Sequence, residues 1–217
     1  MIIRAAALTA VVAAAGVVLY RRLLREPVLT WGATPDEAAR ELPGDELLED
    51  ADIVSTRAVA IDAPASAVWP WLVQMGPGRA GAYTYDWIEN LLGLDMHSAD
   101  TVVPELQHLE VGEVIKGTRG EGTGMRVELL EPQHVLATRS EDGRWVWSFV
   151  LAEEDGSTRL VSRNRISTGG LSRSGKLGMA MMEPGSLVME RKMLLGIKER
   201  AERLAREESE QLVFAAR

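Results

Sequence analysis

The chain has 217 residues, with 24 basic against 32 acidic side chains and a formal net charge of −8 at pH 7. Its 46% hydrophobic content excludes a disordered chain. The absence of cysteine excludes disulfides, thiolate zinc sites and cysteine nucleophiles, and the net acidity argues against nucleic-acid binding.

The first predicted element is an apolar run at residues 5–20, which contains no charged side chain and precedes Arg21 and Arg22. As a helix this run spans about 24 Å, less than the ~30 Å hydrocarbon core, so the residues on either side would complete the span. We interpret residues 1–25 as a membrane anchor that contacts the bilayer through residues 4–22. The arginines after the run predict that the rest of the chain is cytoplasmic. A cleaved signal peptide, giving a secreted protein, and a soluble helix are the alternatives.

An acidic connector follows at residues 26–55. Residues 31–55 hold eight acidic side chains and one arginine. Thr34 and Pro35 predict the start of a short helix that ends near Leu42. We interpret the acidic side chains as a solvated linker that anionic lipid repels.

A globular domain is predicted over residues 56–208, with a tail at 209–217. The pattern indicates a strand at 56–61, helices at 65–75 and 83–92, and strands at about 113–118, 125–131, 134–139, 144–151 and 159–167. Two of the intervening turns contain Asp-Gly, which is typical of hairpins. A long amphipathic helix at 183–208 closes the domain, and the loop at 170–176 is expected to be a flexible connector. The order predicts an α+β fold, with a curved antiparallel sheet around the long C-terminal helix and a cavity between them.

Four segments resemble the SRPBCC superfamily, the START-like group with a helix-grip fold. They are RAVAIDAP at 57–64, VWPWLVQMG at 68–76, YTYDW at 83–87 and VMERKMLLGIK at 188–198. The chain is similar to actinobacterial members of the polyketide cyclase and lipid-transport type that carry an N-terminal hydrophobic segment. The resemblance implies a cavity for an apolar ligand and specifies no reaction.

Aromatic and methionine side chains are the predicted lining of that cavity. Alternation places Trp145, Trp147 and Phe149 on one face of a strand, and Tyr83 and Trp87 share a helical face at i, i+4. Methionines gather near the last helix, where flexible thioethers suit an apolar surface. The predicted ligand-binding residues are Trp69, Tyr83, Trp87, Met125, Trp145, Trp147, Phe149, Met182, Met189 and Met193.

Polar candidates for catalysis are few, namely Tyr83, His97 and Asn164. If Asn164 points inward, it needs a buried partner such as a ligand carbonyl, whereas Arg163 and Arg165 on the other face are expected to point to solvent. Gly196 interrupts the last helix, which predicts a close approach of the sheet or the ligand.

Three motifs lack the context that their chemistry requires. The glycines at 76, 78 and 81 match a dinucleotide pattern without the strand before it, and the P-loop-like run at 170–176 is followed by leucine instead of Ser or Thr. Asp95, His97 and Asp100 lack the spacing of a metal site. The sequence therefore predicts no metal and no cofactor.

The favoured function is a membrane-tethered protein that binds or transfers a hydrophobic small molecule, such as a lipid, an isoprenoid or a polyketide-like compound. A cofactor-independent polyketide cyclase, aromatase or lyase is the first alternative. The second is a protein-interaction module, as in chaperone regulators of the superfamily, with a protein partner bound by the charged segments.

Overall fold

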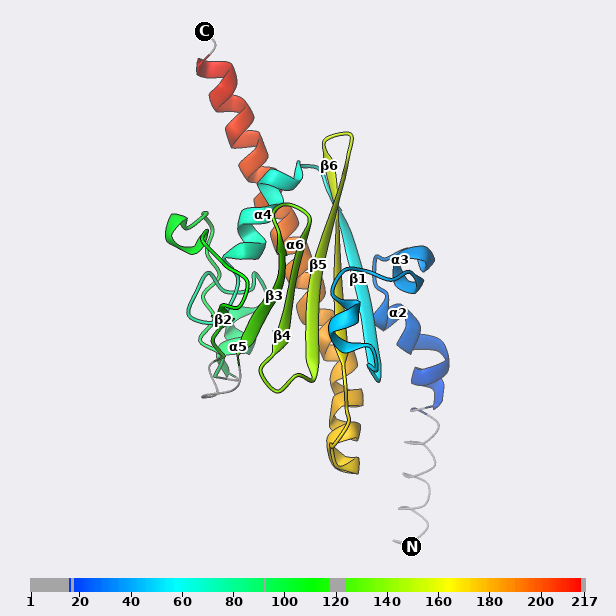
Figure 1. Ribbon diagram of the computed structural model, residues 1–217. Helices are drawn as coiled ribbons and strands as arrows, with labels where there is room; N and C mark the ends of the chain where they lie inside the picture. Colours follow the sequence, from blue (N-terminus) through cyan, green and yellow to red (C-terminus); the bar gives the residue numbers. More distant parts are fainter. Residues whose placement is uncertain (1–15, 17, 92, 118–123, 216–217) are drawn as a thin grey trace, which may run out of the picture.

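A six-stranded antiparallel sheet forms the centre of the protein, as seen in a computed structural model that describes residues 16, 18–91, 93–117 and 124–215 (Figure 1). The strand order is β1-β6-β5-β4-β3-β2. β5 and β6 pair along their whole length through the turn at Asp155 and Gly156, so the predicted hairpin is confirmed. The strands are β1 (Ile53–Ile61), β2 (Val114–Ile115), β3 (Met125–Glu131), β4 (Val135–Ser140), β5 (Trp145–Glu154) and β6 (Ser157–Ile166).

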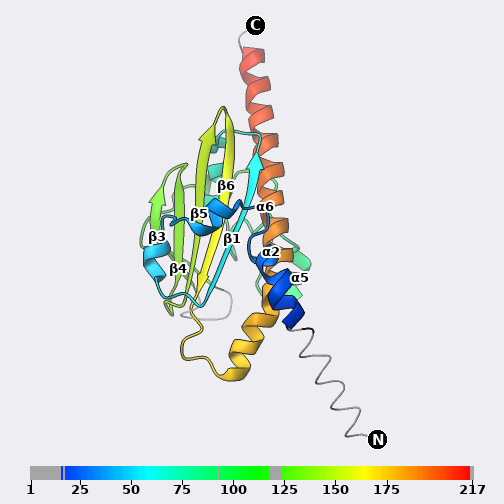
Figure 2. The same cartoon turned by 90° about the vertical axis from the view of Figure 1, so that its right-hand side faces the viewer.

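One long helix, α6 (Arg173–Ala215), crosses a face of the sheet and projects beyond it at both ends (Figures 1 and 2). Its buried residues Met193, Leu194, Ile197 and Ala201 pack in the core with α4 (Ala65–Val73). The predicted helix-grip architecture is thereby confirmed. The helix begins before Pro184, so the expected connector at 170–176 is wrong in its last residues. Proline and several glycines disfavour a helix there, and contacts with the N-terminal segment outweigh that preference.

The second predicted helix is shorter than expected. α5 covers Asp86–Leu91, and Tyr83 lies before it with a φ of 58°. Tyr83 and Trp87 therefore do not share a helical face, and the prediction of a helix from residue 83 is wrong. A left-handed backbone at a non-glycine residue breaks a helix, and the sequence pattern carries no signal for it.

The N-terminal segment enters through two short helices, η1 (Tyr20–Leu24) and α2 (Arg25–Leu29). Residues 1–15 and 17 of the predicted anchor lie outside the described residues. Within the ranges that the structure describes, no helix is long and apolar enough to cross a membrane.

The acidic connector packs on the outer face of the sheet, opposite α6. It contains α3 (Pro35–Ala39) and η2 (Asp45–Leu48), and its Leu42 is buried against Ala58 and Val161. Arg163 of β6 is only 3% exposed and donates to the Asp45 carboxylate at 2.6 Å. The solvated-linker interpretation is therefore wrong for this segment, because Leu42 is buried and two of its acids, Glu37 and Asp45, pair with arginines on the outer face of the sheet, although most of its other acids are exposed.

The expectation that Arg163 and Arg165 point to solvent is also wrong. Arg163 donates to the carbonyl oxygens of Glu37, Ala38 and Arg40, and Arg165 donates to that of Leu48. A guanidinium carries five donors, which suits the capping of several irregular carbonyls at once.

The stability contributed by Glu37 is expected to depend on pH. Two hydrogen bonds from Arg159, both 2.7 Å, together with the Thr34 amide, lower the pKa of Glu37 from its ordinary 4.5 to about 2. A lowered folded-state pKa stabilises the fold above the unfolded value, and this stabilisation is lost as pH falls through the folded value. Glu37→Gln should therefore reduce the free energy of unfolding by about 2 kcal/mol at pH 7 and by much less near pH 2.

Urea unfolding followed by circular dichroism at both pH values measures this difference. Glu105→Gln, on the exposed helix η3 (Pro104–Leu106), is the matched control and should differ little from the parent at either pH. A Glu37→Gln effect of the same size at pH 7 and pH 2 would contradict the proposed role of the ion pair.

Candidate functional site

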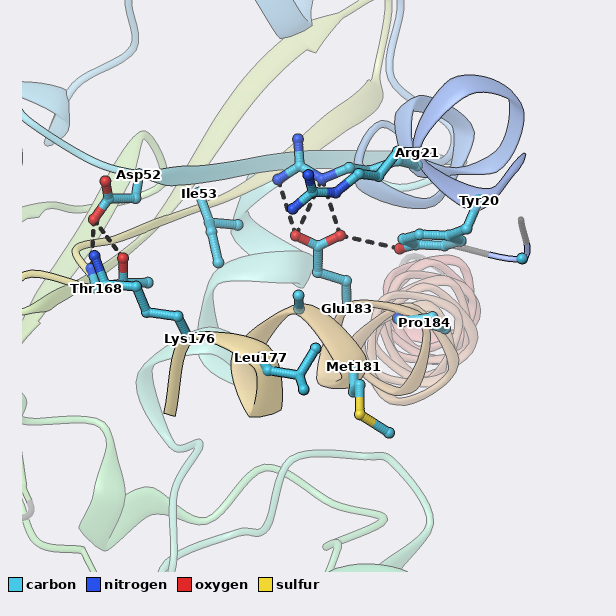
Figure 3. Close-up of a pocket in the computed structure, with 13 residues that line it drawn as sticks. Tyr20, Arg21, Asp52, Ile53, Thr168, Lys176, Leu177, Met181, Glu183 and Pro184 are labelled. Atoms are coloured by element: carbon cyan, nitrogen blue, oxygen red, sulfur yellow. Dashed lines mark hydrogen bonds and ion pairs between the residues drawn. The ribbon is translucent and has the colours of Figure 1, made fainter. Parts of the chain in front are cut away.

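A groove of about 780 Å³ lies where the N-terminal helices meet the beginning of α6 (Figure 3). One side comes from η1 and α2, and the other from the first turns of α6. The start of β1 and the segment after β6 close its end. Its lining residues are Gly16, Tyr20, Arg21, Arg25, Asp52, Ile53, Thr168, Lys176, Leu177, Ala180, Met181, Glu183 and Pro184.

Both acidic side chains of the groove are engaged. Glu183 accepts hydrogen bonds from Arg25 at 2.9 Å and from the Tyr20 hydroxyl at 3.0 Å. Burial is the larger cause that raises the pKa of Tyr20, and the hydrogen bond to Glu183 is the second. Asp52 accepts from the amide and the hydroxyl of Thr168, and these bonds lower the pKa of Asp52. The groove therefore presents few free acceptors to a ligand.

Two cations of the groove are not neutralised in this way. Arg21 and Lys176 line it and are exposed, and neither forms a contact ion pair within the described part of the chain, although the Lys176 charge helps to lower the pKa of Asp52. The apolar lining comes mainly from Ile53, Leu177 and Met181. The groove thus combines an apolar wall with a positive rim.

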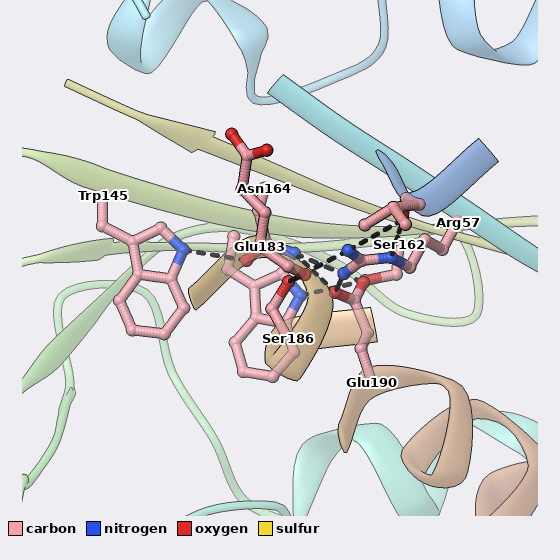
Figure 4. A network of polar contacts seen from close by, with 9 residues as sticks. Arg57, Trp145, Ser162, Asn164, Glu183, Ser186 and Glu190 are labelled. Carbon is pink, nitrogen blue, oxygen red and sulfur yellow. Dashed lines mark hydrogen bonds and ion pairs between the residues drawn. The ribbon is translucent and has the colours of Figure 1, made fainter. Parts of the chain in front are cut away.

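A buried polar network lies between the sheet and the part of α6 next to the groove (Figure 4), whereas the packing farther along α6 is apolar. Arg57 of β1 is fully buried and forms an ion pair with Glu190 of α6. Arg57 also donates to the Val28 carbonyl at 3.1 Å and to the Ser186 hydroxyl at 3.0 Å. Glu190 accepts a hydrogen bond from Ser162 at 2.7 Å. Burial raises the pKa of Glu190, although the Arg57 charge and the Ser162 hydrogen bond act to lower it.

The sheet aromatics complete this network. Trp145 and Trp147 stack with ring centroids 5.6 Å apart, and Trp147 lies 4.9 Å from Phe149. The indole N–H of Trp145 donates to the Asn164 side-chain oxygen at 2.8 Å, and that of Trp147 donates to the Ser162 hydroxyl at 2.9 Å. The three rings share one face, as the alternation predicts, but their polar atoms bind the protein itself.

None of the other predicted ligand-binding residues lines the groove either. Met193 is buried in the core, and Trp69 packs against that core. Met182 and Trp87 are 65% and 69% exposed. Two more are half-buried, Met125 on β3 and Met189 on α6.

The three catalytic candidates are not brought together. Tyr83 is buried, donates to the Trp71 carbonyl and accepts from Gln74, both at 3.0 Å, and burial raises its pKa. His97 is exposed and contacts Asp95. Asn164 donates to Glu190, so its buried partner is a carboxylate and not a ligand carbonyl.

Gly196 faces this Tyr83 loop. A Cβ at Gly196 would lie 2.6 Å from the Tyr83 carbonyl oxygen, so the close approach is neither to the sheet nor to a ligand.

The discarded motifs have structural roles. Gly76 and Gly81 form an isolated bridge that closes a loop after α4. Asp100 pairs with Arg200 at 2.6 Å. No group of three or more His, Asp or Glu side chains suited to a metal is found among the described residues.

Sequence reasoning missed the groove because its residues carry other signals. Arg21 and Arg25 follow an apolar run and indicate a membrane boundary, and Lys176 lies in a segment rich in Gly and Ser. Asp52 and Thr168 meet only through the pairing of β1 with β6, where Ile53 is opposite Ile166.

Comparison with known proteins identifies similar solved structures, whereas no family model and no curated protein matches the chain. A polyketide cyclase-like protein from Corynebacterium glutamicum is 16% identical over 73% of this chain and 93% of that one, with a TM-score of 0.37. A protein from Nitrosomonas europaea is 12% identical over 71% and 97%, with a TM-score of 0.45. The Aha1 dimer from Colwellia psychrerythraea is 17% identical over 69% of this chain and 96% of that one, with a TM-score of 0.41.

The order of elements within the chain defines its fold. An antiparallel sheet in the order β1-β6-β5-β4-β3-β2 is gripped against one C-terminal helix, α6. This chain has the helix-grip fold that its resemblance to SRPBCC proteins implied.

Proposed function

We propose that this chain is a membrane-tethered binding protein for a small amphipathic molecule, which has a hydrophobic body and an acidic group. The observation that carries the proposal is the groove at the start of α6. Its volume of about 780 Å³ falls within the range of small-molecule sites, roughly 300–1,000 Å³. Residues 1–25 would serve as the tether, and the arginines after the apolar run favour a domain on the cytoplasmic side.

The distribution of charge in the groove selects the ligand class. Arg25 satisfies Glu183, and Thr168 satisfies Asp52, whereas Arg21 and Lys176 remain available. A carboxylate or phosphate on the ligand would bind these cations, since charge-assisted hydrogen bonds are about twice as strong as neutral ones. Leu177 and Met181 would contact the hydrophobic body.

This position differs from the cavity expected between the middle of the sheet and α6. The Arg57–Glu190 pair fills part of that space with charge, and an apolar ligand there would have to displace a satisfied network. The groove gives no support to the cyclase alternative, because the catalytic candidates Tyr83, His97 and Asn164 do not line it.

Photolabelling of the full chain tests the proposal. The probe is a fatty acid with a diazirine in its acyl chain, added to protein purified in detergent. We expect saturable labelling that oleate competes away more effectively than methyl oleate, because the ester lacks the anionic group. Ala180→Trp fills the groove and should weaken competition by oleate at least about ten-fold, equivalent to the loss of ~1.4 kcal/mol of binding energy.

Ala215→Trp is the matched control, since it introduces the same side chain at the exposed end of the same helix. Its labelling should equal that of the parent. Labelling that does not saturate, or that Ala180→Trp leaves unchanged, would overturn the groove as the binding site.

A further inference from the structure

Exposed apolar side chains gather at the end of the molecule where the N-terminal helices meet α6. Eight of the fifteen exposed large apolar side chains of the described chain lie on the N-terminal segment and the first half of α6, and each of the eight is more than 50% exposed. Figures 1 and 2 both place the N-terminal helices and the beginning of α6 at the same end, far from the β5–β6 turn. We name this set the apolar end face; it consists of Val18, Leu19, Leu23, Leu24, Leu177, Met181, Met182 and Val188.

The spacing of these residues makes a continuous surface along each helix. Leu177 and Met181 are separated by one helical turn on α6, as are Leu19 and Leu23 on the N-terminal side. Tyr20 binds Glu183 across the two elements, so the two stripes are held beside one another. A monomeric soluble protein rarely leaves such a surface uncovered.

Basic side chains outnumber exposed acidic ones beside the apolar end face. Arg21, Arg22 and Lys176 are exposed there, with Glu26 and Asp52 as the exposed acids of the adjoining segments, although the whole chain carries a net charge of −8. The nearby Glu183 is 5% exposed and is bound to Arg25. A partner that is apolar inside and negatively charged at its surface complements this arrangement.

We propose that the apolar end face docks on an anionic lipid bilayer. The apolar side chains enter the acyl boundary, and the three cations contact lipid phosphates, each basic residue contributing about five-fold to the binding constant near the surface. The uncharged run at residues 5–20 leads directly into this face, which argues for a bilayer over a protein partner. Docking places the groove at the headgroup level. The inference extends the proposed function but does not require a ligand in the groove.

The absence of cysteine allows a clean depth measurement on the full chain. Met182→Cys carries the environment-sensitive fluorophore NBD on the face, at a position outside both the groove lining and the proposed tether. Glu154→Cys, beside the β5–β6 turn, carries it at the opposite end as the control. The protein is reconstituted into phosphatidylcholine vesicles with or without 30% phosphatidylserine, and doxyl-labelled lipids quench the fluorophores within the bilayer.

In vesicles with phosphatidylserine we expect a several-fold rise in NBD fluorescence and strong doxyl quenching at residue 182, and neither at residue 154. Arg22→Glu, which lies outside the groove, should reduce the quenching at residue 182, as should neutral vesicles. A water-exposed label at residue 182 on protein that co-sediments with vesicles would overturn the proposal. If the label at residue 182 becomes shielded from water as the protein concentration rises in the absence of vesicles, the proposal is overturned and the face instead binds a second copy of the chain.

Failure here leaves the photolabelling result in detergent intact, because that experiment contains no bilayer. Failure of photolabelling likewise leaves the depth measurement intact. The two proposals are therefore tested separately.

Discussion

Arg57→Met is expected to lower the free energy of unfolding by about 3–5 kcal/mol, because it leaves the buried Glu190 carboxylate without its counter-charge. It also removes the donor that holds the Val28 carbonyl and so loosens the N-terminal segment. Glu190→Leu should cost a similar amount, since the fully buried Arg57 guanidinium then lacks its carboxylate. Chemical denaturation of the full chain, followed by circular dichroism, measures both effects.

The double variant Arg57→Met/Glu190→Leu separates the ion pair from its surroundings. Apolar replacements of both partners often restore stability. We therefore expect the double variant to be more stable, by about 2 kcal/mol or more, than the sum of the two single losses predicts. Strictly additive losses would show that the two side chains contribute independently, and this would contradict their role as a coupled lock between β1 and α6.

Arg163→Leu is expected to destabilise the protein by about 3 kcal/mol, because three connector carbonyls and the Asp45 carboxylate lose a buried donor. The loss should be local at first, with hydrogen exchange accelerating at residues 34–48 before the sheet opens. Hydrogen exchange with mass spectrometry reports the connector directly, and urea unfolding reports the total.

Arg144→Leu supplies the comparison for this effect. Arg144 is exposed and pairs with Asp142 at 2.9 Å, so its replacement should change stability by no more than about 0.5 kcal/mol. Equal exchange rates at residues 34–48 in the two variants would contradict the role given to Arg163 in holding the connector on the sheet.

Much of the sheet was predictable because its signals are local. The turn residues between the strands and the alternation at Trp145, Trp147 and Phe149 place β3 to β6 within a few residues of their observed bounds. The long stripe that includes Met193 and Ile197 likewise requires a packing surface, and the sheet provides it. Periodicity and turn chemistry act over short stretches, so one chain suffices to read them.

The outer face and the candidate site were not predictable, because they depend on pairings over long sequence separations. An acidic run has the composition of a linker whether it is solvated or, like Asp45, folded onto an arginine such as Arg163. Arg25 meets Glu183 across 158 positions of the sequence. No short sequence pattern predicts such a contact. The arginine carries a stronger local signal as the boundary of an apolar run.

The central claim is that a small amphipathic molecule binds beside the start of α6, and the position of the photolabel tests it most directly. After tryptic digestion and fragmentation of the labelled full chain, we predict saturable, oleate-sensitive modification within residues 177–184 of the peptide spanning residues 177–191, and none at Ser186 or Glu190 of the buried network. The same modification on the peptide spanning residues 145–159, which contains the sheet aromatics Trp147 and Phe149, would contradict the account and place the ligand in the interior instead.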